Sequence, residues 1–379
     1  MKIENIHDEC TACMACYSCC PKQCISIRLD NEGFYYPVVD KEKCVSCGKC
    51  EAVCHCLNKP QKIQNIRKSY YGFSKSDEIL QKSTSGGAFW HLAQHIVSNG
   101  GNVYGAAFDL DKRVLFHTDS NSVGLDTLLK SKYIESAMND TIKKIQNDID
   151  SGKDVLFCGT PCEVSGVRKA VEDKNNHLIL VDFICHGVPS SRLFREHLNK
   201  IIGGEQLLEL DFRPKDKGWS SKNIAIKTKI KSETTPYVYD SFYSGFMTYN
   251  AFLRKCCYDC KFRSERFSDI TIADFWGYRD YDPELNTEKG LSLIVAHTET
   301  GDSILQSIKD KFNLYDLDNK YSDYAFNQRD YSEALKLRKK FYSIYEKKGF
   351  EYAAGHTYMK GIWKSKLKHQ IKRMIGMVR

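Results

Sequence analysis

One cysteine spacing occurs twice near the beginning of the chain. Each copy has the form C-x2-C-x2-C-x3-C, and the second begins 34 residues after the first. The eight cysteines are Cys10, Cys13, Cys16, Cys20, Cys44, Cys47, Cys50 and Cys54. Equal runs at a fixed offset indicate an internal duplication. A loop with two-residue gaps places three thiolates on three corners of one cubane cluster, while the fourth cysteine ligates the other cluster.

The duplicated spacing predicts a bacterial-type ferredoxin module with two 4Fe-4S clusters in residues 1–65. One cluster is expected to take Cys54 with the first three cysteines of the first copy, and the other to take Cys20 with the first three of the second copy. Structural zinc sites are the alternative, but zinc modules separate their cysteine pairs by a longer span. His55 follows the second copy where Pro21 follows the first, so the turn after the second copy is less constrained.

The seventeen cysteines of the 379-residue chain form two groups, eleven within the first 56 residues and six between residues 158 and 260. The start of the chain lacks the basic and apolar stretches of a secretory signal, so we expect a cytoplasmic protein with reduced thiols. Grouped, reduced cysteines indicate bound metal rather than disulfides. Cys19, Cys24 and Cys56 exceed the expected ligands and are interpreted as small buried side chains.

Positive charge is concentrated at the end of the chain. The net charge is +8, yet residues 329–379 alone hold fourteen Lys and Arg against four Asp and Glu. With no zinc-finger, helix-turn-helix or RNA-recognition pattern, nucleic-acid binding is not expected. Residues 321–379 are expected to form a basic helical tail, ending in an amphipathic helix over 360–379 that contacts an anionic membrane surface, docks on a partner or packs on its own domain. No apolar run is long enough to predict a membrane-spanning helix.

The segment after the cysteine repeats begins with a polar stretch that lacks periodicity. Residues 57–67 are therefore interpreted as a linker, with a domain boundary near residue 65. Ser85, Gly86 and Gly87 then precede an expected helix over residues 88–97. Free N–H groups at such a helix start can hold the pyrophosphate of a dinucleotide. A serine that only caps the helix gives the same sequence, so both interpretations stay open here.

An alternation of strands and helices follows. Residues 154–158 and 178–184 are expected to be buried strands, each followed by a helix, over 163–171 and about 190–202. This β-α-β-α order predicts two parallel strands in an α/β domain. Cys162 and Cys185 would then lie at the carboxyl end of the sheet, where such sheets bind ligands. Alternating apolar residues also predict a strand over 222–230.

A further cysteine pair stands at Cys257 and Cys260. With Cys162 and Cys185, it makes four thiols of the type that ligates a third 4Fe-4S cluster. A zinc site and unrelated buried cysteines are the alternatives. Sequence spacing alone does not join two such distant pairs.

Several motifs resemble the coenzyme F420 hydrogenase/dehydrogenase beta-subunit family. They are Ser85-Gly86-Gly87, Ser131-Lys132-Tyr133, Cys158-Gly159-Thr160-Pro161-Cys162, residues 182–190 (DFICHGVPS), residues 212–219 (FRPKDKGW), and Cys257-x-x-Cys260 followed by residues 268–277 (SDITIADFWG). The similarity runs from about residue 68 to beyond residue 300. It implies that residues 66–320 form an α/β domain with a mixed sheet that binds FAD and a 4Fe-4S cluster.

The resemblance also implies roles for particular residues. The third-cluster ligands would be Cys162, Cys185, Cys257 and Cys260, and the flavin contacts would be Ser85, Gly86, Gly87, Lys132 and Tyr133. For Lys132 an exposed helix-end lysine is the alternative, and for Tyr133 it is core packing.

Electron transfer is the function that these parts predict. Clusters carry single electrons and a flavin exchanges one or two, so the chain is expected to be an oxidoreductase that takes electrons from a ferredoxin-like donor to FAD and an unidentified small molecule. A non-catalytic relay subunit and a zinc-stabilised scaffold are the alternatives. His186, Asp269 and Asp274 are candidate proton donors, although structural roles suit them better. A shared fold does not identify the substrate, so use of a deazaflavin is not predicted.

Overall fold

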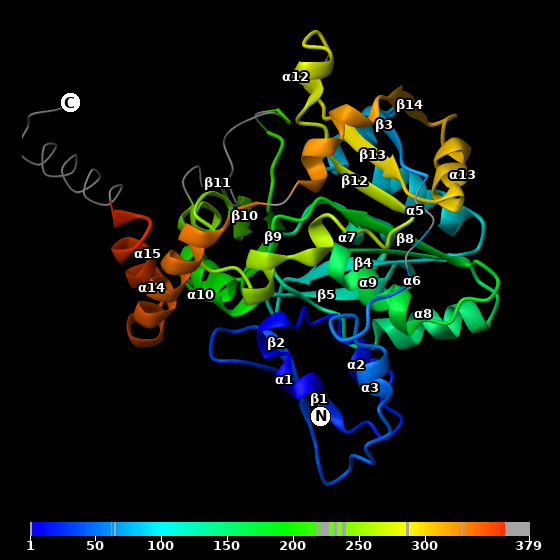
Figure 1. Cartoon of the computed structure of the whole chain (residues 1–379). Coiled ribbons are helices and arrows are strands. Elements are labelled where there is room, and N and C mark those ends of the chain that lie inside the picture. The colour runs from blue at the N-terminus through cyan, green and yellow to red at the C-terminus, as the bar shows by residue number, and fades with distance from the viewer. Residues whose placement is uncertain are drawn as a thin grey trace, which may run out of the picture.

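A nine-stranded mixed sheet is the centre of the protein (Figure 1). The computed structural model describes residues 2–360 except 62, 64–65, 217, 220–226, 231–232, 237–239, 286–287 and 328. Along the sheet the strands are β14 (Phe312–Leu317), β3 (Lys68–Ser74), β13 (Ser292–Ala296), β12 (Ile270–Asp274), β8 (Leu178–Phe183), β7 (Val155–Gly159), β4 (Asn102–Asp109), β5 (Val114–Asp119) and β6 (Ser136–Ala137). The predicted α/β class with a mixed sheet is confirmed.

Four neighbouring strands in the middle of the sheet, β12, β8, β7 and β4, run parallel. Strands β7 and β8 pair directly, with Val155 opposite Leu178, so the two predicted strands are both present and parallel. Because parallel strands need crossover connections, helices are expected on the faces of the sheet. The carboxyl ends of β7, β8 and β12 meet at one edge.

Helices cover both faces of this sheet. Helices α5 (Ala88–Ser98) and α13 (Glu299–Ser307) pack on one face, and α8 (Thr141–Asp150) and α9 (Pro161–Ala170) pack on the other. Along β7, Leu156 faces the first layer while Val155 and Phe157 face the second, and all three are fully buried. A strand buried on both sides reads as a continuous apolar run, as this one does.

A capping box fixes the start of α9. The Thr160 hydroxyl accepts a hydrogen bond from the Glu163 N–H, and the Glu163 carboxylate accepts one from the Thr160 N–H at 2.7 Å. Pro161 occupies the first turn, where its missing N–H costs nothing. The helix therefore begins two residues before the predicted position and holds Cys162 in its first turn.

A second core lies beside the sheet. It joins α10 (Ser191–Ile202), α14 (Ser332–Lys348) and α15 (Phe350–His356), near a small sheet of β9 (Leu207–Asp211), β10 (Lys227–Ile230) and β11 (Glu233–Pro236). Strand β10 is the described part of the predicted strand over 222–230. Residues 361–379 of the predicted basic helix lie outside the described residues. No helix among the described residues is long and apolar enough to span a membrane.

His197 ties this second core together with two hydrogen bonds. Its ring contacts Asp240 Oδ2 at 2.6 Å and Glu351 Oε1 at 2.9 Å, and it is buried on α10. Burial opposes a charged ring, but the two carboxylates outweigh this and raise the pKa of His197 to about 9. Since this pKa lies above the ordinary value, the stabilisation is complete below about pH 6.5 and is lost as the pH rises towards 9.

Urea unfolding between pH 6 and pH 9 checks this effect. The wild-type chain is expected to lose stability over this interval, and His197→Gln is expected to remove that pH dependence because it cannot gain the charge. An unchanged pH dependence in His197→Gln would assign it to another group.

The two cysteine repeats have the same backbone conformation. Ala12 (φ 57°) and Ser46 (φ 53°) occupy equivalent positions, as do Met14 (φ 57°) and Gly48 (φ 74°), and all four have positive φ. Each repeat then enters a single helical turn, α2 (Ala15–Ser18) and α3 (Lys49–Ala52), and a hairpin of β1 (Ile25–Leu29) and β2 (Tyr35–Val39) lies between them. The structure thus carries the duplication that the spacing indicates.

The remaining elements are short. They are α1 (Lys2–Asn5), α4 (Asp77–Lys82), α6 (Ser120–Val123), α7 (Leu125–Leu128), α11 (Ser241–Tyr243), α12 (Tyr278–Tyr281), η1 (His7–Glu9), η2 (Ser244–Thr248), η3 (Lys255–Asp259), η4 (Lys261–Arg263), η5 (Asn319–Tyr321) and η6 (Asp323–Phe326). Figure 1 shows the N-terminal module below the sheet, where its helix α2 lies against α8 and α9.

Candidate metal centres

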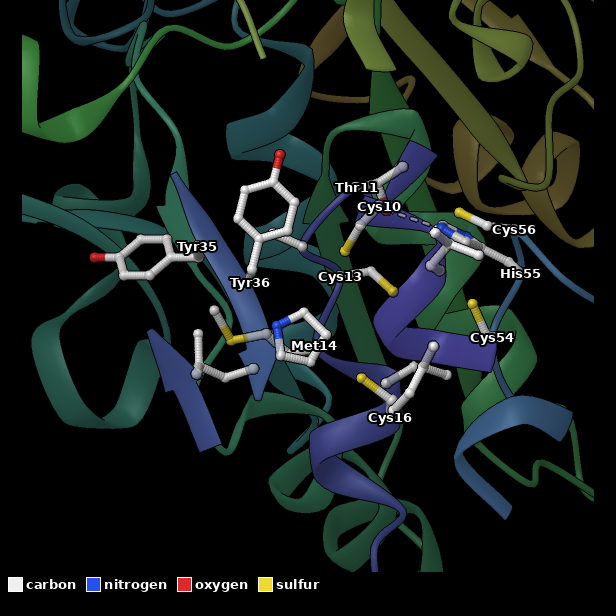
Figure 2. Close-up of a pocket in the computed structure, with 16 residues that line it drawn as sticks. Cys10, Thr11, Cys13, Met14, Cys16, Tyr35, Tyr36, Cys54, His55 and Cys56 are labelled. Carbon is white, nitrogen blue, oxygen red and sulfur yellow. Dashed lines mark hydrogen bonds between the residues drawn. The ribbon is translucent and has the colours of Figure 1, made fainter. Parts of the chain in front are cut away.

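The first cysteine-lined pocket combines cysteines from both repeats. Cys10, Cys13 and Cys16 line it together with Cys54, among mostly apolar neighbours. Figure 2 shows the four sulfur atoms around a common space. This is the set that the sequence predicts for one cluster, and its role as a ligand set stays a prediction. We call it the first site.

Three thiols of the first site, those of Cys10, Cys13 and Cys16, are unfavourable as free thiolates, whereas a hydrogen bond with Cys56 lowers the pKa of Cys54. Burial raises the pKa of the Cys13 thiol to about 12 and raises that of the Cys10 thiol as well. Several buried thiolates in one apolar pocket need a positive partner, and metal ions supply it by binding the deprotonated form. The donor set therefore fits an iron–sulfur cluster.

The second pocket is lined by the complementary set, Cys20, Cys44, Cys47 and Cys50. We call it the second site. Helices α2 and α3 explain why the two repeats exchange their fourth cysteines. Helix α2 carries Cys16 of the first site and ends just before Cys20 of the second, while α3 carries Cys50 of the second site and ends just before Cys54 of the first. Residues 45–49, which pass over this site, are all exposed.

The surplus cysteines differ in their surroundings. Cys24 is buried and lines the second site, with its Sγ 3.4 Å from Cys20 Sγ. Cys19 and Cys56 are only half-buried, so the expectation of small buried side chains holds for Cys24 alone.

A third cavity, of about 250 Å³, gathers the remaining predicted ligands. Cys162 reaches it from the first turn of α9, Cys185 from the end of β8, and Cys257 and Cys260 from η3 and the residue after it. Cys256, to which the sequence assigns no role, also lines this cavity. We call it the third site. The chain thus brings together two pairs that spacing alone does not connect.

Each of the three cysteine sets lines its own pocket. Within the described part of the chain, no three His, Cys, Asp or Glu side chains gather closely enough to hold a single metal ion. In a cubane cluster the four cysteines bind four different iron atoms, so their sulfur atoms need not converge on one point. Cysteines arranged around a pocket suit such a cluster.

A buried arginine joins the N-terminal module to the main domain, and nothing in its sequence surroundings identifies it. Arg254 is 1% exposed and donates hydrogen bonds to the carbonyl oxygens of Cys10, at 2.6 Å, and Tyr35, at 2.9 Å. It also forms an ion pair with the buried Glu135, whose carboxylate accepts a hydrogen bond from the Tyr35 N–H at 3.0 Å. One guanidinium therefore connects the main domain with the backbone of a predicted cluster ligand.

Helix α9 touches the module at a glycine. A Cβ at Gly166 would lie 2.6 Å from Cys13 Cβ and 2.8 Å from its Sγ, closer than real Cβ contacts. Gly166 stands one turn after Cys162, so it lies on the same face of the helix. The helix that begins at the third site therefore also packs against a cysteine of the first.

The predicted flavin contacts already have protein partners. The Ser85 hydroxyl donates to the Leu291 carbonyl at 2.7 Å, and the Gly86 N–H donates to Ser292 Oγ at 3.0 Å, so this turn is bound to the sheet beside β3 and β13. Gly86 has no room for a side chain, because a Cβ would lie 2.4 Å from the Gly72 carbonyl oxygen. Gly87 begins α5 with a φ of 87°.

Lys132 and Tyr133 are half-buried near the carboxyl edge of the sheet. The Lys132 ammonium donates to the Leu129 carbonyl at 2.5 Å, and burial lowers the pKa of this lysine to about 7. The Tyr133 ring packs edge-on against Phe212 and Tyr243. Both side chains thus have contacts within the protein, and a flavin role for them stays a prediction.

The three candidate proton donors lie in different places. Asp274 ends β12 at the carboxyl edge, where it pairs with Arg213 and accepts a hydrogen bond from Trp219 Nε1 at 2.8 Å. Asp269 precedes the same strand, at the opposite edge, and is bound by Arg168 and the Leu180 N–H. Of these two aspartates, only Asp274 is therefore on the side of the cysteine turns.

His186 follows a predicted ligand, and its ring is held by neighbouring side chains. Its Nε2 donates to Asn250 Oδ1 at 2.6 Å, and its Nδ1 accepts from the Arg329 guanidinium at 2.7 Å. Burial lowers the pKa of His186 to about 4, so the ring is neutral near pH 7. Both nitrogens are occupied, which is the arrangement of a structural residue.

Comparison with known proteins agrees with the sequence motifs. Residues 152–320 match the family described as the C terminus of the coenzyme F420 hydrogenase/dehydrogenase beta subunit. A chain in a solved structure of the F420-reducing NiFe hydrogenase complex from Methanosarcina barkeri aligns with 77% of this chain and 94% of its own length, at 14% identity and a TM-score of 0.48. No curated protein matches. The family match spans all four cysteines of the third site. Residues 152–320 are therefore similar to the C terminus of the coenzyme F420 hydrogenase/dehydrogenase beta subunit, the family that the sequence motifs resemble.

Proposed function

We propose that the protein is an iron–sulfur flavoprotein oxidoreductase that passes electrons from a ferredoxin-like donor through three 4Fe-4S clusters to FAD and an unidentified small molecule. The observation that carries the proposal is the sorting of twelve cysteines into three separate pockets with four expected ligands each. The similarity of residues 152–320 to a hydrogenase/dehydrogenase beta subunit supports the redox role.

The chain's own residues hold and shield the proposed clusters. The three cysteine sets supply the ligands, the apolar lining of the first site keeps water out, and Arg254 fixes the module against the main domain. Bound clusters exchange single electrons, and a bound flavin exchanges one or two. The assignment of FAD rests on the family motifs alone. The side chains of Ser85 and Lys132 already donate hydrogen bonds to backbone carbonyl oxygens, so their contacts give no support of their own.

A non-catalytic relay subunit is the second candidate. The family is described as a beta subunit, which implies partner proteins in its members. Such a subunit would carry the clusters and hand electrons to a separate enzyme without reducing a small molecule itself.

Cofactor analysis of anaerobically purified protein tests the proposal. We expect about twelve iron and twelve acid-labile sulfide per chain, from four of each in every cluster, and one FAD. Three clusters without flavin would favour the relay subunit. Two clusters and no flavin, or zinc in a colourless protein, would contradict the oxidoreductase.

A further inference from the structure

The side chain of His55 lies between the first and third sites. It is 2% exposed and lines both the pocket of the first site and the cavity of the third. Thr11 and Cys56 are also common to both linings. A single layer of side chains therefore separates these two sites, although the second cysteine repeat and η3 are about 200 residues apart in the chain.

The ring of His55 is fixed in this position. Its Nε2 makes a 2.8 Å hydrogen bond with Thr11 Oγ1, drawn in Figure 2, and its face stacks on Phe262 at 4.6 Å. Its Nδ1 is buried and has no hydrogen-bond partner within the described residues. A buried polar atom without a partner is costly, so its surroundings should supply one. Cysteine sulfur is abundant in both linings, and sulfur atoms of a cluster accept hydrogen bonds.

Helix α9 makes a second connection between the same two sites. It holds Cys162 in its first turn, and one turn later Gly166 touches Cys13. The second site has no such link to the third, because the linings of these two sites share no residue. Its covering loop, residues 45–49, is exposed.

From this arrangement we infer that the three sites form one electron route in the order second, first, third, and that His55 is the positioning residue between the first and third sites. The inference rests on the proposed function. The second site faces solvent and can meet a donor protein. The first site adjoins the second through helices α2 and α3, and it adjoins the third through His55. Each step moves one electron and breaks no bond.

Hydrogen bonds to cluster sulfur are among the factors that set reduction potentials. A donor near the sulfur atoms stabilises the reduced, more negative cluster. Loss of the imidazole is therefore expected to lower the potential of the first cluster, the third, or both. The second cluster should keep its potential, because His55 does not line its pocket.

The test is a redox titration of the full-length, anaerobically reconstituted protein, followed by low-temperature electron paramagnetic resonance. His55→Phe keeps an aromatic ring against Phe262 but removes both nitrogens. His95→Phe makes the same change on α5, across the sheet, and serves as the control. Cys47→Ser and Cys260→Ser assign the signals of the second and third sites by their loss.

We expect His55→Phe to lower the potential of the first or third cluster and to leave the second unchanged, with no shift in His95→Phe. Thr11→Val removes the hydrogen-bond partner of His55 but keeps the histidine, and it is expected to shift the potentials of the same clusters. This variant replaces His55→Phe in the test if His55→Phe loses a cluster. No shift in either variant, or a shift of the second cluster alone, would overturn the inference. Absence of cluster signals from the wild-type protein would instead contradict the proposed function.

Discussion

Replacing Arg254 by leucine is expected to lower the free energy of unfolding by about 3–5 kcal/mol, the range for breaking a buried ion pair on one side. The carboxylate of Glu135, which is 3% exposed, would lose its charged partner, and the carbonyl oxygens of Cys10 and Tyr35 would lose a donor. Urea unfolding monitored by circular dichroism measures the change. Because these groups join the module to the main domain, the first site should also lose iron.

Two further variants make the Arg254 result specific. Lys336→Leu removes a partner from the exposed pair with Glu333 and is expected to change stability by no more than about 0.5 kcal/mol. Arg254→Leu combined with Glu135→Leu removes both charges and should recover part of the loss, because no unpaired carboxylate remains. A change below about 1 kcal/mol in Arg254→Leu would show that this guanidinium does not hold the module in place.

The second large effect is expected for Gly166→Ala. In an isolated helix this change is favourable by up to about 1 kcal/mol. In this protein the new methyl group would overlap Cys13, so either α9 or the first cysteine loop must move. The first site should then bind its cluster poorly, and the iron content should fall from about twelve to about eight per chain, the loss of one cluster of four.

Lys169→Ala is the matched control for this variant. Lys169 lies on the same helix, is half-buried and also becomes alanine, so any general effect of alanine on α9 appears there too. Its iron content is expected to stay at the wild-type level. Full iron content together with higher stability in Gly166→Ala would contradict the close contact between α9 and the module.

Local patterns in the sequence predict much of the fold. The apolar runs at 155–157 and 178–181 identify β7 and β8 because these strands are buried on both faces. The helix predicted between them over 163–171 is α9, although the capping box of Thr160 starts it two residues earlier. The exchange of cysteines between the first two sites is also predictable, since the repeat itself encodes it. The domain boundaries and cofactor assignments stay predictions.

Contacts between distant segments are what the sequence does not show. Arg254 and Glu135 are 119 residues apart, and neither has a neighbouring pattern that marks it as a partner. The third site joins two cysteine turns of the sheet edge with η3, which only the folded chain brings together. Asp269 and Asp274 share one short motif, yet β12 separates them by its full length and places them at opposite edges. His55 gains its position only because the module docks against the third site.

The proposed function requires that the cysteine pockets hold redox-active iron–sulfur clusters. Low-temperature electron paramagnetic resonance of anaerobically purified protein, before and after dithionite, tests it most directly. We expect a brown protein that gains signals of reduced 4Fe-4S clusters, integrating to more than about two spins per chain and broadened by interaction between neighbouring clusters. A colourless protein that stays without a signal after dithionite would contradict it.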